Sequence, residues 1–233
     1  EWFDATLVSF CLAAFGLTSV AALVQVRFGT YPLTFWEAWR SVFDPAVWTQ
    51  PNVLATFFLG ERAAGALGFS TEYDLTTATT IVWNIRLPRV FTAALVGLSL
   101  SISGTIFQAI TRNELASPFI LGVSSGAGFA VLVTLVLIPS FGFLLPLTAA
   151  VGGTVAFLLV YAIAWQGGTS PVRLVLAGVI VGTVLNSLQT ALYFFATDLG
   201  TVQQAISWTT GSLTGADWAQ FRIILPFVLL IVI

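Results

Sequence analysis

Residues Arg86–Gly128 contain two long apolar runs with only a few polar residues between them. The first run has small residues throughout, and the second opens with Gly122, Gly126 and Gly128. Small residues allow close approach of two helix backbones, which is how helices associate inside a bilayer. A soluble core does not need this combination. The stretch therefore predicts two membrane helices joined by a tight turn.

Charged side chains are too scarce to cover a water-facing surface. Hydrophobic residues make up 58% of the chain and charged residues 8%, whereas a soluble domain carries about 25% charged residues. This predicts an all-α fold, a polytopic integral membrane helix bundle. The net charge of −2 and the absence of a basic run give no indication of nucleic-acid binding.

Several residue types needed for common chemistry are missing. The chain has no histidine, and all eight basic residues are arginines. A phosphate-binding P-loop requires lysine, and many metal and acid–base sites require histidine. Cys11 is the only cysteine, so no internal disulfide forms, and we expect it to be a buried small side chain. We predict a protein that is not an enzyme and holds no cofactor or metal.

Five apolar runs are long enough to cross a bilayer, and a sixth is shorter. The predicted spans are Ala5–Phe28, Pro88–Ile110, Phe119–Ile138, Phe143–Trp165 and Val172–Phe195, followed by Phe221–Ile233. Thirteen helical residues reach roughly 20 Å, against a hydrocarbon core of about 30 Å. We expect residues 1–233 to form a single, incomplete transmembrane domain with five complete spans, a truncated sixth, and more chain beyond it.

Two segments between the spans are too polar to cross. Residues 29–85 contain acidic residues, prolines and the tryptophans Trp36, Trp39, Trp48 and Trp83, which suit a membrane–water interface. We expect short surface helices at Leu33–Phe43 and Asn52–Gly68, without a hydrophobic core of their own. Residues 199–218 are expected to contain a further surface helix, at Thr201–Leu213.

One polar stripe lies inside an apolar span. Thr183, Asn186, Ser187 and Thr190 recur at helical spacing, with Gln189 beside them. Polar groups at mid-bilayer are costly unless they meet a partner or water. The stripe indicates either a wetted translocation path or hydrogen bonding between helices.

Two further groups lie at span ends. Arg86 and Arg89, one turn apart, are either arginines that extend to the interface or a docking patch for carboxylates of a partner. Asn113, Glu114 and Leu115 occupy the turn between two spans, where Ser117 before Pro118 also fits a helix N-cap.

Three ordered motifs resemble the FecCD family of ABC importer permeases. The first combines RLPR at Arg86–Arg89 with SGTIFQ and NELASPFILGVSSGA, close to the family's N-P-L-A-x-P-x-x-L-G-[IV]-S-x-G-A. The others are RLVLAGVIVG from Arg173 and WTTGSLTGADW at Trp208–Trp218. Glu114 departs from the family's proline, which indicates a less rigid turn.

The resemblance implies a multi-pass plasma-membrane permease with ten spans, residues 29–85 outside, and the turns at 112–117 and 166–171 in the cytoplasm. Its partners would be a second permease subunit, most simply in a homodimer, two cytoplasmic ATPase subunits, an external substrate-binding protein and membrane lipid. Its cargo would be an iron–siderophore, haem or cobalamin. The alternatives are an unrelated channel fragment or a membrane-embedded enzyme, although no pair of acidic residues lies within a span.

The resemblance also assigns residues. Arg86 and Arg89 would meet glutamates of the binding protein. A cytoplasmic gate would use Asn113 and Leu115, with a second constriction at Thr169 and Ser170. The span that contains Thr183, Asn186, Ser187 and Thr190 would line the path.

Overall fold

The computed structural model describes residues 4–114, 117–165, 168, 170–196 and 198–232. Every regular element in these residues is helical, as predicted. Backbone contacts divide the chain into two units, Glu1–Ser99 with Leu213–Ile233 and Leu100–Ser212. Helix α7 (Leu87–Thr111) runs through the boundary between them.

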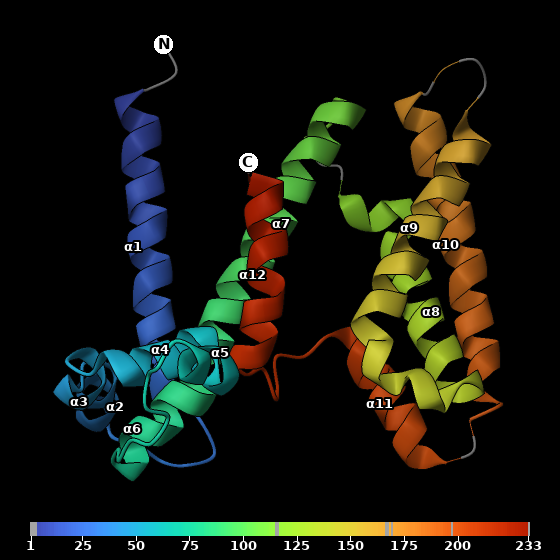
Figure 1. The fold of residues 1–233 in the computed structure, drawn as a ribbon. Helices are drawn as coiled ribbons and strands as arrows, with labels where there is room; N and C mark the ends of the chain where they lie inside the picture. Colours follow the sequence, from blue (N-terminus) through green and yellow to red (C-terminus); the bar gives the residue numbers. More distant parts are fainter. Residues whose placement is uncertain (1–3, 115–116, 166–167, 169, 197, 233) are drawn as a thin grey trace. The chain divides into compact units, whose positions relative to one another are not determined.

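The first unit combines long apolar helices with a cluster of short ones. The long helices are α1 (Ala5–Arg27), the start of α7, and α12 (Trp218–Val232). The short ones are α2 (Phe35–Val42), α3 (Pro45–Trp48), α4 (Pro51–Leu59), α5 (Glu61–Ala66) and α6 (Thr77–Ile81). Figure 1 shows the short helices gathered near the Arg27 end of α1.

Local capping explains where the short helices begin. Thr34 and Glu37 form a reciprocal capping box at the start of α2, which satisfies backbone N–H groups that a helix end leaves free. Asp44 caps α3, and Pro45 follows at its first position. Gly60 has φ 90° and ends α4, so the predicted helix over Asn52–Gly68 is instead two helices.

The short helices share a core with the long ones. Val47, Val53 and Phe57 pack with Val82 and Trp83 next to α7, and with residues of α12. Trp83 is only 2% exposed, so the interfacial role predicted for this tryptophan is wrong. Its indole N–H donates to the Ser41 carbonyl at 2.9 Å and its ring stacks on Phe57, which removes it from water.

The second unit is a bundle with α8 (Val123–Leu137), α9 (Leu145–Ala164) and α10 (Pro171–Tyr193) side by side (Figure 1). The 3-10 turns Pro118–Leu121 and Pro139–Leu144 precede α8 and α9, and α11 (Leu199–Thr210) packs on α8. Ser117 accepts a hydrogen bond from the Phe119 N–H, which confirms the predicted cap. Gly122, in the left-handed region at φ 72°, then starts α8 at Val123 instead of Phe119.

Glycines hold α8 and α9 together. A Cβ on Gly126 would collide with Ala156 and with the Gly152 carbonyl, and one on Gly152 would collide with Ala130 and the Gly126 carbonyl. Such backbone contact is possible only without side chains. The small residues of α8 and α9 therefore allow close approach, and Gly126 pairs with a glycine of the next helix, whereas a Cβ on Gly97 or Gly104 of α7 would meet none of the described atoms within 4 Å.

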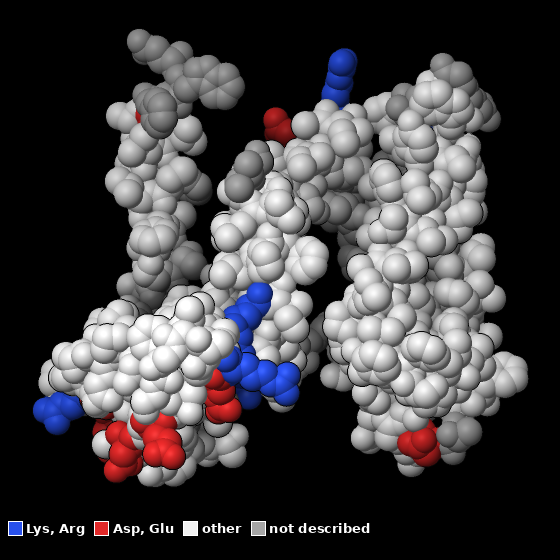
Figure 2. All heavy atoms as spheres, viewed as in Figure 1, with Lys and Arg blue, Asp and Glu red and all other residues white. Residues whose placement is uncertain are grey.

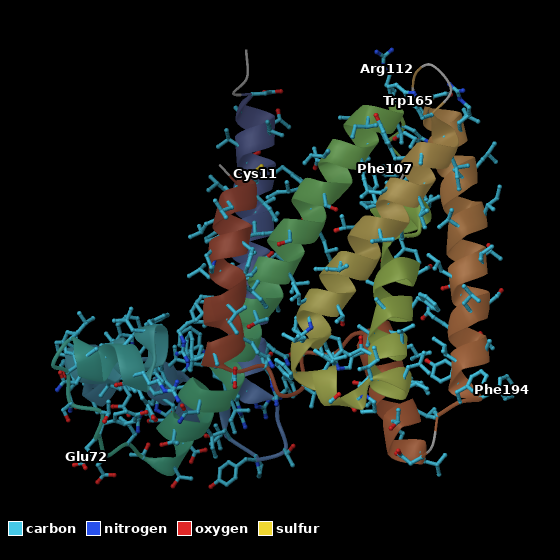
Figure 3. All side chains as sticks on the ribbon, turned by 45° about the vertical axis from the view of Figure 1, so that its right-hand side comes forward. Cys11, Glu72, Phe107, Arg112, Trp165 and Phe194 are labelled. Atoms are coloured by element: carbon cyan, nitrogen blue, oxygen red, sulfur yellow. The ribbon has the colours of Figure 1, made fainter. Side chains whose placement is uncertain are left out.

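Within the described residues, four helical segments are long and apolar enough to span a bilayer: Ala5–Arg27, Thr77–Thr111, Pro139–Ala164 and Pro171–Tyr193. Helices α8 and α12 are apolar but shorter, so the predicted count of five complete spans is not confirmed. Cys11 is exposed on α1, contrary to expectation (Figure 3). Acidic side chains gather on the short helices and on the loop between α5 and α6, and the long helices carry few charges (Figure 2).

The second predicted span begins earlier than Pro88. A π-helical turn over Val82–Arg86 connects α6 to α7, and the Leu87 N–H donates to the Val82 carbonyl five residues back. The wider turn lets the helix continue through Pro88, which has no backbone N–H to donate. Helical structure therefore runs from Thr77 to Thr111.

Candidate functional site

The polar stripe of α10 is an exposed face of an otherwise apolar helix. Thr183, Asn186, Ser187 and Thr190 are all exposed. The Thr183 hydroxyl donates to the Val179 carbonyl at 2.8 Å, and those of Ser187 and Thr190 donate to the carbonyls four residues before them, each at 3.0 Å. These bonds stay within α10, so among the described residues the stripe does not tie this helix to a neighbouring one.

The bond between helices comes from Gln189, which the sequence places only beside the stripe. Its side chain is 9% exposed, and Nε2 donates to the Ser125 carbonyl of α8 at 3.0 Å and to Asn186 Oδ1 at 3.1 Å. A Cβ on Gly128 would lie 2.8 Å from Gln189 Oε1. The glycine at that position of α8 therefore makes room for the amide.

The turn after α7 holds Asn113 by a Schellman arrangement. Arg112 is left-handed at φ 49°, and the Asn113 N–H donates to the Gln108 carbonyl at 3.2 Å. The Gln108 side chain donates to the Glu114 carbonyl at 2.8 Å. Arg112 and Trp165 lie at one end of the second unit and Phe194 at the other (Figure 3).

Asn113 also lines a pocket of about 260 Å³. Thr111 accompanies it on one side, and Pro171, Val172, Val175 and Leu176 of α10 form the other. The pocket thus brings one predicted gate residue next to the start of α10. Ser170 is the residue before α10, and its side chain does not cap the helix. Leu115 and Thr169, the other two predicted gate residues, lie outside the described residues.

Arg86 and Arg89 lie one turn apart in different surroundings. Arg86 is 5% exposed, and its guanidinium donates to the carbonyls of Val26, Arg27 and Tyr31, where the chain leaves α1. Gly29 allows this approach, since a Cβ there would lie 3.1 Å from Arg86 Nη2. Arg89 is half-buried, and its Nε atom has no hydrogen-bond partner in the described part of the chain.

No cluster of three or more histidine, cysteine, aspartate or glutamate side chains suited to a metal ion occurs among the described residues. What the site offers is hydroxyls, amides and carbonyls. These groups can accompany a polar solute.

The model of the FecCD transport family matches residues 17–233. The chain belongs to this family. The FecCD match covers the α7–α8 turn, the pocket beside α10 and the polar stripe. Together with its apolar helices, it makes this chain a multi-pass protein of the plasma membrane.

Curated FecCD relatives include three permease proteins. The achromobactin transport permease CbrC of Dickeya dadantii is 46% identical over 66% of this chain and 44% of its own length. The ferric enterobactin permease FepG of Escherichia coli is 40% identical over 66% of this chain and 47% of its own length. The vitamin B12 permease BtuC of Vibrio cholerae is 37% identical over 60% of this chain and 43% of its own length. The chain thus spans about half the length of the curated relatives it matches.

A solved structure shares the fold. It is described as a metal-chelate type ABC transporter in an inward-facing conformation, and it matches with a TM-score of 0.68 at 21% identity. The match covers 95% of this chain and 59% of that one.

Proposed function

We propose that this chain is part of the permease subunit of an ABC importer and that it forms one wall of the path for a metal chelate. The observation that carries the proposal is the exposed polar stripe on α10, at Thr183, Asn186, Ser187 and Thr190. The three hydroxyls of the stripe donate within α10, so the cost of facing lipid would fall mainly on the Asn186 amide. Facing a wetted path, the same groups remain solvated and contact cargo. The names of two relatives, which refer to ferric enterobactin and vitamin B12, support this class of cargo.

The path requires a closure toward the cytoplasm. We assign it to the turn that contains Asn113 and Leu115, together with Thr169 and Ser170 before α10. The pocket shared by Asn113 and the first turns of α10 supports this assignment, because movement of either element changes its width. Alternating access would open this closure when the external side is shut.

An external binding protein would dock at the Arg86–Arg89 turn. Arg89 is the better donor to a partner carboxylate, because its side chain is only half-buried, whereas that of Arg86 is 5% exposed. Arg86 already donates to three carbonyls, so its contribution is to hold the loop after α1 in place. A second permease subunit, most simply an identical one, and two cytoplasmic ATPase subunits complete the assembly.

The central test is substrate uptake by the intact importer in proteoliposomes. Asn186→Leu removes the amide from the stripe, and Val184→Leu changes an exposed apolar residue of the same helix. We expect the first to reduce ATP-driven uptake by about tenfold or more, with assembly intact, and the second to have little effect. Loss of assembly in Asn186→Leu would show a structural role instead. Uptake without ATP would favour a passive channel.

Docking is tested separately, by the affinity of the binding protein for the reconstituted importer. Charge reversal in Arg89→Glu should weaken it by a few kcal/mol if the pair is desolvated. The control is Arg112→Glu, at the opposite mouth in the proposed topology. Unchanged affinity of the Arg89 variant would contradict the docking assignment.

A further inference from the structure

The hydrogen bonds around Gln189 have a fixed direction, which begins at a backbone carbonyl. The Ser125 oxygen can only accept, so the Gln189 atom 3.0 Å from it must be the amide nitrogen. The same nitrogen lies 3.1 Å from the Asn186 side chain, which must therefore present its oxygen. The N–H₂ group of Asn186 consequently points away from Gln189.

The other three members of the stripe differ in what they can offer. Thr183, Ser187 and Thr190 each have one hydroxyl proton, and each donates it to a carbonyl of α10. Their outward-facing capacity is therefore limited to oxygen lone pairs. The Asn186 amide is the one side chain of the four with protons left to donate.

We propose that Gln189 is a positioning residue that holds the N–H₂ group of Asn186 toward the translocation path, so that this level of the path selects cargo with acceptor oxygens on its surface. The proposal rests on the function proposed above and adds the polarity of the contact. An Asn186 amide without this anchor could present its oxygen as readily as its nitrogen. Gln189 removes that freedom through its bond to α8.

Gly128 supports the assignment from the opposite side. Its missing side chain leaves room for Gln189 Oε1, since a Cβ there would lie 2.8 Å from that oxygen and 3.2 Å from Thr209 Cγ2 of α11. Helices α8, α10 and α11 therefore meet around the Gln189 amide. A substitution at Gly128 can displace Gln189 while the four residues of the stripe themselves remain unchanged.

The experiment measures ATP-driven uptake by the intact importer in proteoliposomes, with a ferric chelate whose surface carries carboxylate oxygens as the probe. Four variants are compared: Asn186→Leu, Asn186→Asp, Gln189→Met and the double variant Asn186→Leu/Gln189→Met. Thermal unfolding of each purified complex is the structural control. Gln189→Met keeps the approximate size of the side chain and removes its polar groups.

If Gln189 acts through Asn186, Gln189→Met reduces uptake by about fivefold, the factor for one lost hydrogen bond, and the double variant is no worse than Asn186→Leu. Asn186→Asp should be as defective as Asn186→Leu, because it replaces the donor by acceptors. Gly128→Ala should reduce uptake in the same direction.

Losses that multiply in the double variant would overturn the proposal, as would normal uptake by Asn186→Asp. Reduced uptake by Asn186→Leu with normal uptake by Gln189→Met would overturn this inference alone. Normal uptake by Asn186→Leu would overturn the path assignment as well, so the two failures are distinguishable.

Discussion

The indole N–H of Trp218 donates to the carbonyl of Trp83 at 2.6 Å, although the two residues are 135 positions apart. Trp83 belongs to the π-helical turn before α7, and its own indole N–H reaches the Ser41 carbonyl of α2. The two tryptophans therefore connect α12, the entry to α7 and the short helices. Both side chains are buried.

Replacing Trp218 by phenylalanine should destabilise the protein by about 1–3 kcal/mol, because a buried carbonyl loses its donor. The ring contacts with Phe58 and Phe91 would be largely kept. Thermal unfolding of the detergent-solubilised protein measures the effect. Trp208→Phe, at an exposed tryptophan of α11, is the control, and an equal loss there would remove the significance of the Trp83 bond.

Replacing Gly152 by alanine should destabilise the α8–α9 pair by about 1–3 kcal/mol, because the new methyl group would overlap Ala130 and the Gly126 backbone. Gly142→Ala is the matched control, since none of the described atoms lies within 4 Å of its Cβ position. Chemical denaturation followed by helical circular dichroism separates the two. Equal midpoints would contradict close backbone packing.

Replacing Arg86 by lysine keeps the charge and removes the planar fork that serves three carbonyls. We expect destabilisation of about 1–3 kcal/mol and faster proteolysis of the loop after α1. Arg27→Lys, at an exposed arginine in the same region, should change neither. If Arg86→Lys had normal stability and normal proteolysis but lower affinity for the binding protein, the main role of Arg86 would be docking, and the structural role predicted here would be wrong.

Tyr73, between α5 and α6, should titrate at unusually high pH. Burial raises the pKa of its phenol, and the nearby Glu61 carboxylate raises it further. The pKa of Tyr73 is therefore higher in the folded protein than in the unfolded chain. The contribution of the neutral phenol to folding stability is complete below the usual tyrosine pKa and is lost as pH rises through the raised value. The ultraviolet difference titration between wild type and Tyr73→Phe measures this, and ionisation at the ordinary tyrosine pKa would contradict it.

The membrane class and most helix positions could be predicted from the sequence, because hydropathy and breaks are local properties. The span predicted over Val172–Phe195 is observed as Pro171–Tyr193, and the one over Ala5–Phe28 as Ala5–Arg27. The start of the second helical segment at Thr77 could not be predicted, since Pro88 ordinarily marks a helix start. The π-helical turn that carries the helix through it leaves no recognisable pattern.

The stripe on α10 was visible as spacing, yet its chemistry was not. A sequence shows that Asn186 and Gln189 are three residues apart, but not that Ser125 supplies the acceptor that orients both amides. Likewise, Arg86 and Arg89 look equivalent in the motif, and only Arg86 is enclosed by the end of α1.

The sequence alone determined that this chain is a membrane protein, through its scarcity of charged residues, and to which family it belongs, through the order of its motifs. Both are properties of the sequence that do not depend on tertiary contacts. Only the tertiary structure decided which amide bridges two helices, which arginine is enclosed and which tryptophan is buried. These outcomes depend on contacts between residues as many as 135 positions apart. Hydrogen bonds of this kind are directional and nonlocal, so they exist only once the helices have packed.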